Sequence, residues 1–509
     1  MSRLYVGLHC LAHDASMCVY DSYQDRFYYI KFERMNNIKH YAANNFIEWV
    51  AYIKWLGFDS KDVKAVCSTI HEYDQFFLLV KDSKFINNPK LEEHKISHHL
   101  AHLLSQGTPS GLVYDGEGTD NECLSIYSDF NRKISYHNKT HFSLGLMYRD
   151  SYYDSGYENR SYITDSFHNF NPKAADIPGK VMAWEAYGEY LPKFQEFYKN
   201  LTLKDSENWR NLENFNAICH YFTDEKDPFK IQGSFIKNIT IKVIQEIKQL
   251  LHFTIKSNDS FSFSGGVAQN LIINNALKEQ FPNLQINAHN QDDGLSIGCL
   301  QYLLDTYGLN KKVELKDYPF CQEDENMGYA TLPTIKKVAE YLAQGKIVLW
   351  CQGNGEIGPR ALGNRSVLMD PGISDAKEQV NNRVKKREWY RPYAASVMLN
   401  KYQDYFDLPW ESPYMLYQAK VKDPVKFKAI THADGTCRIQ TVNPIQFSFH
   451  ELLEEFEKLT GYPILLNTSL NLPGSPIVGR KEIALDMFKN SQADYLVIGD
   501  TIYERNNND

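Results

Sequence analysis

Hydrophobic and polar residues alternate along the first part of the chain in patterns that predict short strands and helices. The segments RLYVGLHC (3–10) and ASMCVYD (15–21) are apolar runs separated by a turn that contains His-Asp, which predicts a β-hairpin. FIEWVAYIKWLGF (46–58) has apolar residues at helical spacing, which predicts a helix that ends before Gly57. KAVCSTI (64–70) is predicted to be a strand. Locally paired strands followed by a helix are therefore expected at the N-terminus.

The middle of the chain continues with strands and longer helices. EEHKISHHLAHLLSQG (92–107) is predicted to begin as a loop and to become helical at its SHH. GLVYDGEG (111–118) reads as a strand that ends in an acidic, glycine-rich turn, with CLSIYS (123–128) as its partner. Residues 150–260 are expected to be mostly helical, and FSFSGGVAQNLIINNALKEQ (261–280) predicts a strand, a glycine turn and a helix. This succession predicts an α/β fold.

A second domain is predicted where the pattern begins again. TLPTIKKVAEYLAQGKIVLWCQGN (331–354) predicts a new helix and strand after an irregular stretch at about 320–335. We therefore expect two domains, residues 1–330 and residues 331–509.

Composition narrows the class of protein. The net charge of −8 argues against a general nucleic-acid binder, because phosphate binding needs a basic surface. The nine cysteines form no CxxC pair and are odd in number, which indicates reduced thiols in the cytoplasm. The N-terminus resembles a strand and a turn, not a signal peptide, and no apolar run is long enough to cross a membrane. The oligomeric state is not fixed by the sequence, and a homodimer is one candidate.

Two histidines in SHHLAH form the first candidate site. His98 and His102 are four residues apart and would share one face of a helix. Carboxylates from VYDGEG (Asp115) and from NQDDGLS (Asp292 or Asp293) could complete a site for Fe(II), Mn(II) or Zn(II). The alternative is a pair of histidines that only cap or pack the helix.

Glycine turns and a lysine suggest a phosphate site. Gly265 and Gly266 lie between a predicted strand and a predicted helix, where backbone N–H groups can approach a phosphate. Lys180, which follows Gly179, could be a further phosphate contact. A tight turn and a solvated lysine are the plainer interpretations.

Arginines collect in glycine- and proline-rich segments of the second domain. GEIGPRALGNRS (355–366) carries Arg360 and Arg365, and VKKREWYRPYAAS (384–396) follows it. Forked guanidinium groups match the oxygens of phosphates and carboxylates, so these segments predict a pocket for a small anion. An ion-paired surface is the alternative. Arg365 could be a ligand contact or part of an internal salt bridge.

Taken together, these segments resemble the O-carbamoyltransferases, of which the tobramycin, cephamycin and nodulation enzymes are examples. The resemblance rests on ten motifs that occur in the family's order from residue 7 to about residue 478. They are HDAS, HHLAH, VYDGEG, GKVMAWEAYG, SGGVAQN, DDGLSIG, GPRALGNRS, YRPYAAS, HADGTCRIQT and ILLNTSLN.

The resemblance implies an N-terminal actin-like (ASKHA) duplicated α/β module fused to a C-terminal YrdC-like α/β module. It implies that carbamoyl phosphate and ATP, with Mg²⁺, give carbamoyl-adenylate in the C-terminal module. The carbamoyl group would then pass to a hydroxyl of a small-molecule acceptor, such as a natural product or sugar, beside a metal usually taken as Fe(II). No nucleic acid and no membrane would take part.

The family's functional residues can be carried onto matching positions of this sequence. His13 matches the proposed catalytic base, and a neutral imidazole suits that task. The expected metal ligands are His98, His102, Asp115 and Asp292, with the adjacent Asp293 as an alternative to the last. The expected catalytic residues of the second module are Arg360, Lys385 and Arg391, and the expected substrate- and nucleotide-binding residues are Lys180, Gly265, Gly266, Asn270, Arg438, Asn467 and Ser469.

The sequence also departs from the family. Ala395 replaces a proline in YRPYAAS, and Trp184 and Glu185 replace smaller residues in GKVMAWEAYG. The aromatic segment 136–170 is expected to border the acceptor site. Two other functions stay open from the sequence: a transferase that makes threonylcarbamoyl-adenosine in tRNA, and a non-catalytic nucleotide sensor of the actin-like fold.

Overall fold

The computed structural model describes residues 3–10, 13–43, 47–69, 88, 90–154, 177–200, 202–204, 223–256 and 259–505. The chain forms two compact units. The first comprises Met1–Phe32 and His40–Leu315, and the second comprises Glu33–Lys39 and Lys316–Asp509. The change of unit at residue 316 comes earlier than the boundary expected at residue 330, and the short segment 33–39 was not expected in the second unit. In the aromatic segment 136–170, residues 155–170 lie outside the described residues.

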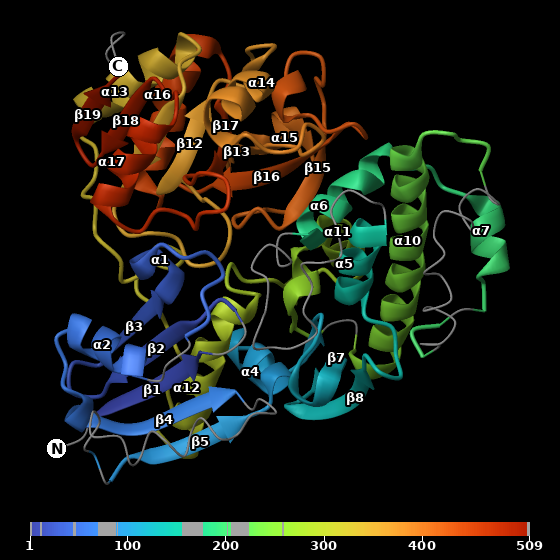
Figure 1. Cartoon of the computed structure of the whole chain (residues 1–509), viewed down its shortest axis with the longest axis vertical. Coiled ribbons are helices and arrows are strands. Elements are labelled where there is room, and N and C mark those ends of the chain that lie inside the picture. Colours follow the sequence, from blue (N-terminus) through green and yellow to red (C-terminus); the bar gives the residue numbers. More distant parts are fainter. Residues whose placement is uncertain are drawn as a thin grey trace. The chain divides into compact units, whose positions relative to one another are not determined.

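Two five-stranded sheets with the same topology form the first unit (Figure 1). In the first sheet the strand order is β3-β2-β1-β4-β5, with β1, β2 and β3 antiparallel and with β4 and β5 parallel to β1. The second sheet has the order β8-β7-β6-β9-β10 and the same pattern of parallel and antiparallel pairs. The strands are Leu4–His9 (β1), Ser16–Asp21 (β2), Arg26–Lys31 (β3), Val63–Thr69 (β4), Glu92–Ile96 (β5), Gly111–Tyr114 (β6), Glu122–Ser128 (β7), Asn131–His137 (β8), Phe261–Ser264 (β9) and Leu284–Gln285 (β10).

This repeat confirms the expected duplicated α/β module of the actin-like type. The predicted hairpin is β1–β2, whose register pairs Leu4 with Asp21 and His9 with Ser16. One local prediction is wrong, because EEHKI is not a loop but strand β5, parallel to β4. Most of β5 is only partly buried at the sheet edge, so its sequence lacks a hydrophobic pattern.

Helices of the first unit lie between and beside these strands. The predicted helix at 46–58 is α2, and the described part of 150–260 consists mainly of helices with non-helical stretches such as 188–191 and 223–227. Among all the described residues of both units, no helix is both long and apolar enough to cross a bilayer. The helices are Phe32–Asn36 (α1, which spans the change of unit), Ile47–Trp55 (α2), His98–Ser105 (α4), Leu144–Asp154 (α5), Ile177–Trp184 (α6), Pro192–Phe197 (α7), Pro228–Thr254 (α10), Leu271–Gln280 (α11) and Leu295–Thr306 (α12).

Close packing of α12 against α4 brings two parts of the candidate site together. At Gly298 in α12 an added Cβ would lie 1.9 Å from the backbone oxygen of Ala101 in α4, so only glycine allows this approach. The residue Asp292 lies in a 3₁₀ turn, Asp292–Gly294, directly before α12. The N-terminus of α12 is thereby held beside the histidine-bearing face of α4.

The second unit is built on one nine-stranded sheet with the order β14-β15-β16-β13-β17-β12-β11-β18-β19 (Figure 1). β17 runs antiparallel to both β12 and β13, and β16 is parallel to β13. The beginnings of β12, β13 and β16 and the end of β17 therefore lie together, at the same end of these central strands. The strands are Val348–Cys351 (β11), Arg365–Met369 (β12), Ala394–Met398 (β13), Phe406–Asp407 (β14), Tyr417–Val421 (β15), Thr436–Val442 (β16), Ile464–Ser469 (β17), Tyr495–Ile498 (β18) and Thr501–Glu504 (β19).

Helices Leu332–Ala343 (α13), Ala376–Val380 (α14), Tyr402–Tyr405 (α15), Phe447–Thr460 (α16) and Lys481–Asn490 (α17) complete this unit. The helix and strand predicted at 331–354 are α13 and β11. The α/β class is confirmed for this unit too, whereas its YrdC-like character stays a prediction.

Candidate functional site

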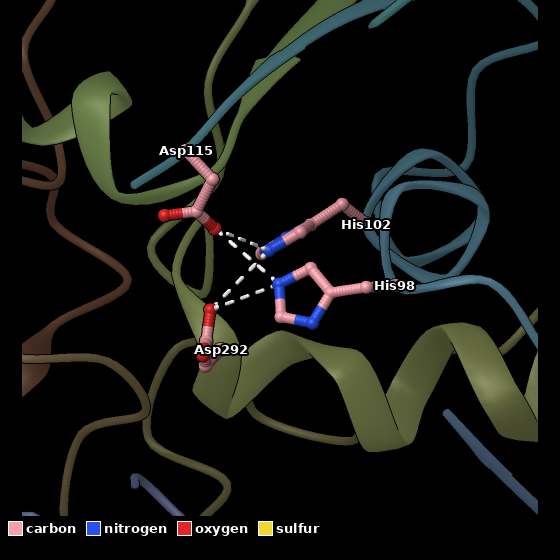
Figure 2. A group of neighbouring side chains, drawn as sticks. All are labelled: His98, His102, Asp115 and Asp292. Atoms are coloured by element: carbon pink, nitrogen blue, oxygen red, sulfur yellow. Dashed lines mark hydrogen bonds and ion pairs between the residues drawn. The ribbon is translucent and has the colours of Figure 1, made fainter. Parts of the chain in front are cut away.

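Four side chains of the first unit converge on one point (Figure 2). Oδ2 of Asp115 lies 3.4 Å from Nε2 of His98 and 3.2 Å from Nε2 of His102. Oδ1 of Asp292 lies 3.5 Å and 3.4 Å from the same two nitrogens. The structure thus brings together the four residues that the sequence analysis had grouped.

Local structure explains why these side chains meet. His98 and His102 are one turn apart on α4, whose first turn is capped by the hydroxyl of Ser97 accepting from the backbone N–H of Leu100. The backbone N–H of His98 also donates to Oγ1 of Thr119, at 2.9 Å. Asp115 follows β6 directly, where the strand ends, and Asp292 lies before α12.

The donor set fits a single divalent cation. Four ligands at bond lengths of about 2.0–2.2 Å around a tetrahedral ion would lie about 3.3–3.6 Å apart, close to the separations seen here. Burial alone would lower the pKa of His98, but the charges and hydrogen bonds of Asp292 and Asp115 outweigh it and raise the pKa to about 10. Two buried carboxylates therefore demand positive charge at this point, and a cation would supply it. Two imidazoles and two carboxylates suit Fe(II), Mn(II) or Zn(II).

The structure separates Asp292 from its neighbour Asp293. The side chain of Asp293 is fully buried, and its Oδ2 lies 3.5 Å from Nζ of Lys31. Its backbone oxygen accepts hydrogen bonds from the hydroxyls of Tyr29 and Ser16, at 2.8 Å and 3.1 Å. Asp292 thus faces the histidines, whereas Asp293 anchors the turn to the first sheet.

The other oxygen of Asp115 links this cluster to the glycine turn. Oδ1 of Asp115 accepts from the backbone N–H of Gly116 at 2.7 Å and of Gly266 at 3.2 Å. Gly265 has φ +93°, and a Cβ there would lie 2.4 Å from the backbone oxygen of Tyr114. The turn therefore requires glycine and lies directly beside the four-residue cluster.

The remaining residues expected near the nucleotide have different surroundings. Asn270 is buried and caps α11, accepting from the N–H groups of Ile272 and Ile273, while its amide donates to the hydroxyl of Tyr148 at 3.2 Å. The structure thus gives Asn270 a helix-capping position. Lys180 is half-buried in the first turn of α6.

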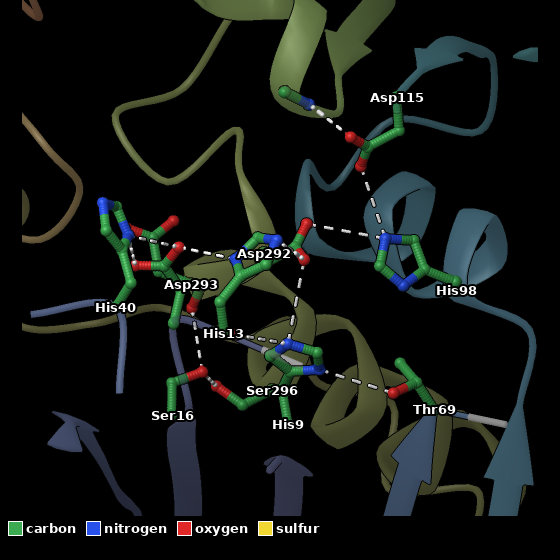
Figure 3. A network of polar contacts seen from close by, with 12 residues as sticks. His9, His13, Ser16, His40, Thr69, His98, Asp115, Asp292, Asp293 and Ser296 are labelled. Atoms are coloured by element: carbon green, nitrogen blue, oxygen red, sulfur yellow. Dashed lines mark hydrogen bonds and ion pairs between the residues drawn. The ribbon is translucent and has the colours of Figure 1, made fainter. Parts of the chain in front are cut away.

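His13 lies on the other side of Asp292 (Figure 3). Its Nε2 is 3.6 Å from Oδ2 of Asp292, and its Nδ1 is 2.8 Å from Oδ2 of Asp14. Burial opposes protonation, but the negative charges of Asp292 and Asp14 outweigh it and raise the pKa of His13. Nε2 of His9 also approaches this group, at 3.8 Å from Oδ2 of Asp292.

The loop GEIGPRALGNRS in the second unit is organised by two buried charges. Oε1 of Glu356 accepts from the backbone N–H groups of Leu362, Asn364 and Arg365, at 2.7, 2.9 and 3.0 Å. The Arg365 guanidinium is fully buried and lies 3.4 Å from Oδ1 of Asp324. It also donates to the backbone oxygens of Gln352, Gly353, Glu325, Asn364 and Val478. Arg365 is therefore the internal clamp of the loop, which resolves the ambiguity left by the sequence.

Arg360 belongs to a cluster of cations near the point where β12, β13 and β16 begin and β17 ends. Burial first, and then the charges of Arg360, Arg387 and Arg391, lower the pKa of Arg438 well below its usual range. Burial and the same neighbours Arg387 and Arg391 also lower the pKa of Lys385. Arg391 forms an ion pair with Glu388 at 3.4 Å. Such mutual repulsion is the state expected of a pocket that receives an anion.

Lys385 and the end of β17 support this cluster. Nζ of Lys385 donates to the backbone oxygens of Ser469 and Asn471, at 2.7 and 2.9 Å, and to the side chain of Asn471. Asn467 is fully buried, and its amide donates to Oγ of Ser396 at 2.9 Å and to the backbone oxygen of Ala361 at 3.3 Å. Asn467 thus lies beneath the loop and supports it from inside.

Sequence reasoning missed several polar residues of the first site. His9, Lys31 and His40 approach Asp14 or Asp292, although they come from strand positions or from a loop that no motif marks. Only Asp14 carried a signal, since it follows His13 within HDAS. In the second unit Arg387, one of the cations that the segment VKKREWYRPYAAS was expected to present, has its guanidinium carbon 3.8 Å from the centroid of the Tyr393 ring.

Comparison with known proteins identifies the C-terminal part of the chain. Residues 339–505 match the family model for the carbamoyltransferase C-terminus. These residues contain the loop GEIGPRALGNRS and every member of the cation cluster.

Curated relatives match over most of the chain. The nodulation protein NolNO of Sinorhizobium fredii is 29% identical over 456 residues, which cover 81% of this chain and 64% of that protein. The 3'-hydroxymethylcephem-O-carbamoyltransferase of Streptomyces clavuligerus is 26% identical over 464 residues, covering 78% of this chain and 86% of that protein. An uncharacterised protein of Synechocystis, sll1178, is 29% identical over 476 residues, covering 79% and 74%.

Solved structures match only distantly. Component A of (R)-2-hydroxyglutaryl-CoA dehydratase from Acidaminococcus fermentans is 9% identical with a TM-score of 0.36, covering 59% of this chain and 97% of that chain. HypF of T. kodakarensis is 12% identical with the same TM-score of 0.36, covering 59% and 48%. At these scores the likenesses do not bear on the chemistry of the site.

Proposed function

Since the chain is a carbamoyltransferase that belongs to the O-carbamoyltransferase family, we propose that it activates carbamoyl phosphate with ATP and transfers the carbamoyl group to a hydroxyl of a small-molecule acceptor. The observation that carries this proposal is the cation cluster around Arg438, in which burial and neighbouring arginines lower the pKa of a guanidinium. A pocket of this kind gains stability when a multiply charged anion enters it.

Activation is assigned to the second unit. Carbamoyl phosphate and water give carbamate and inorganic phosphate. An oxygen of the carbamate then attacks the α-phosphorus of ATP, which forms carbamoyl-adenylate and releases pyrophosphate. Apart from water, every reactant and product in these steps is anionic, so arginines that hold and orient phosphate oxygens would provide most of the catalysis.

The geometry suggests how the residues of this pocket divide the work. Arg360 extends from the loop whose backbone is fixed by Glu356 and Arg365, and we assign it to a phosphate group. Arg438 interacts electrostatically with both Arg360 and Arg391, and we assign all three to the anion site. Lys385 is held by the end of β17 through Ser469, so we propose that Lys385 and Ser469 contact the substrate at that end of the strand. Arg387, a further cation of the segment VKKREWYRPYAAS, joins the site beside Arg438.

Transfer is assigned to the first unit. His98, His102, Asp115 and Asp292 would hold a divalent cation, for which we propose Fe(II), with Mn(II) or Zn(II) as alternatives. Such a cation acts as a Lewis acid that polarises a carbonyl or phosphate oxygen. The glycine turn at Gly265 and Gly266 lies beside the cluster and would let the nucleotide phosphate come close to the backbone, with Lys180 as a further contact. The N–H groups of the two glycines themselves already donate to the backbone oxygen of Asn290 and to Oδ1 of Asp115.

His13 is the proposed base for the acceptor hydroxyl. With the proton of its imidazole on Nδ1, beside Asp14, Nε2 can take the proton of the hydroxyl while the oxygen attacks the carbamoyl carbon. The C–O bond to the adenylate breaks, and AMP leaves as the carbamate ester forms. No nucleic acid or membrane is needed for either step.

The acceptor is best identified by product analysis. Purified protein would be incubated with ¹³C-labelled carbamoyl phosphate, ATP and Mg²⁺, together with a panel of sugars, cyclitols, aminoglycosides and cephem alcohols. Mass spectrometry should detect one panel compound that gains a single labelled carbamoyl group, only when ATP is present. Labelled product that forms equally without ATP would contradict activation through an adenylate.

A further inference from the structure

Asp14 has more ionic and hydrogen-bonding partners than a turn residue needs. Its Oδ2 lies 2.8 Å from Nδ1 of His13 and 3.2 Å from Nδ1 of His40. Its Oδ1 lies 2.7 Å from Nζ of Lys31. The side chain of Asp14 is buried, and that of Lys31 is only 3% exposed, so this ion pair is shielded from water.

The backbone at Asp14 also holds its carboxylate in place. Asp14 has φ +56°, a left-handed conformation that aspartate and asparagine tolerate better than most residues. The backbone of the next residue, Ala15, is anchored at both of its polar groups. Its N–H donates to the backbone oxygen of Tyr41, and its backbone oxygen accepts from the N–H of Phe32. The carboxylate is therefore fixed from both its backbone and its salt bridge.

Burial would raise the pKa of Asp14, but Lys31 and then His40 lower it well below its usual range. Lys31 is itself shared, since its Nζ lies 3.5 Å from Oδ2 of Asp293. A carboxylate fixed in this way accepts a hydrogen bond from the neighbouring imidazole and cannot donate one. It therefore specifies which ring nitrogen of His13 carries the proton.

We propose that Asp14, anchored by Lys31, is a positioning residue that holds a proton on Nδ1 of His13 and so leaves Nε2, on the side of Asp292, to exchange a proton with the acceptor hydroxyl. The proposal rests on the proposed role of His13 in carbamoyl transfer. It gives a role to Asp14 and Lys31, which belong neither to the four-residue metal cluster nor to the cation cluster of the second unit. The arrangement follows the same logic as a carboxylate that orients a histidine base in hydrolases.

Substitution by asparagine separates positioning from packing. Asp14→Asn has nearly the same size and tolerates the same φ, but it removes the charge that pairs with Lys31. A purely structural role therefore predicts lower thermal stability with the His13 tautomer unchanged. An amide can instead donate to Nδ1, which moves the imidazole proton to Nε2 and blocks the base. Asp14→Asn should therefore be as defective as Asp14→Ala in carbamoyl transfer.

The kinetic test measures the two half-reactions apart, in the full-length chain with the acceptor found by product analysis. Asp14→Asn should lower kcat for carbamoyl transfer by about 100-fold or more, with KM for the acceptor nearly unchanged. Formation of AMP and pyrophosphate in the presence of hydroxylamine as a carbamoyl trap should stay at the wild-type rate. Lys31→Met should show the same pattern less strongly, and Asp21→Asn, which removes another buried carboxylate of the first sheet, should keep wild-type kcat.

A spectroscopic test needs no acceptor. Nitrogen-15 NMR of histidine-labelled, zinc-loaded protein, with the His13 signals assigned by their loss in His13→Gln, should place the proton on Nδ1 in the wild type. In Asp14→Asn the proton should move to Nε2. An unchanged His13 tautomer in this variant, or wild-type transfer activity, would overturn the proposal. If wild-type protein forms no AMP from carbamoyl phosphate and ATP, the proposed function fails instead, and the NMR result still decides the role of Asp14.

Discussion

Asp292 and His13 are joined through the carboxylate oxygen that faces away from the histidine pair of α4. Oδ2 of Asp292 lies 3.6 Å from Nε2 of His13, while Oδ1 lies 3.5 Å from Nε2 of His98. One side chain therefore lies between the proposed base and the proposed cation. A substrate that contacts the cation would also lie close to Nε2 of His13, which is the geometry that carbamoyl transfer needs.

Loss of the two histidines of α4 should remove the metal. In a double variant, His98→Ala with His102→Ala, half of the donor set is gone, and metal affinity should fall by more than about 100-fold, since even supporting residues cost 10–100-fold. Inductively coupled plasma mass spectrometry of the purified proteins measures the metal content. His94→Ala, which loses a hydrogen bond to the hydroxyl of Tyr307 and ring contacts with Tyr302 and Tyr307, is the control and should keep the wild-type content. Equal metal in all three proteins would refute the assigned ligands.

Arg365→Met should destabilise the second unit strongly. The variant leaves buried backbone oxygens and the carboxylate of Asp324 without their donor, and such losses cost about 3–5 kcal/mol. Differential scanning calorimetry should show a lower transition temperature for one unit. Arg383→Met is a matched control, because Arg383 is partly exposed and pairs with Asp494 near the surface, where an ion pair contributes about 1 kcal/mol or less. Equal stability of the two variants would mean that Arg365 does not clamp the loop.

His289 should make the first unit less stable in acid. Burial lowers the pKa of His289 to about 4, while its Nε2 lies 3.0 Å from the backbone oxygen of Ser105. The unfolded chain binds the proton near pH 6.5, so stability should be lost as the pH falls from about 6.5 to about 4, by about 3 kcal/mol in total. Urea unfolding at several pH values measures this loss. His289→Gln cannot titrate there and should show a shallower decline, whereas parallel curves for the two proteins would contradict the assignment.

Motif spacing predicted much of both sites because several of their residues lie at the ends of regular elements. His98 and His102 share a helix face, and Asp115 ends a strand, so their convergence could be inferred from the chain. The choice between Asp292 and Asp293 could not, since it depends on which side chain of a 3₁₀ turn faces α4. Arg365 was left ambiguous and Asn467 was expected to bind substrate or nucleotide, because only tertiary packing shows that both are fully buried.

The least predictable features involve long-range contacts between residues without a motif. Lys31 ends β3 and His40 lies in a loop, and nothing in their local sequence indicates that both contact Asp14. Segment 33–39 belongs to the second unit although it is far from residue 316 in the sequence. There the guanidinium of Arg34 donates to the backbone oxygen of Gly358 at 2.9 Å, a contact that hydrophobic periodicity cannot encode.

The most direct test of the account is whether carbamoyl phosphate drives the conversion of ATP to AMP and pyrophosphate. We predict that wild-type protein and the control Arg383→Ala form AMP only when carbamoyl phosphate is present. Arg360→Ala should lose about 100-fold or more of this activity, because a charged contact to the reacting phosphates is removed, and His98→Ala should retain it. AMP formation that does not depend on carbamoyl phosphate, or that Arg360→Ala leaves unchanged, would contradict the account.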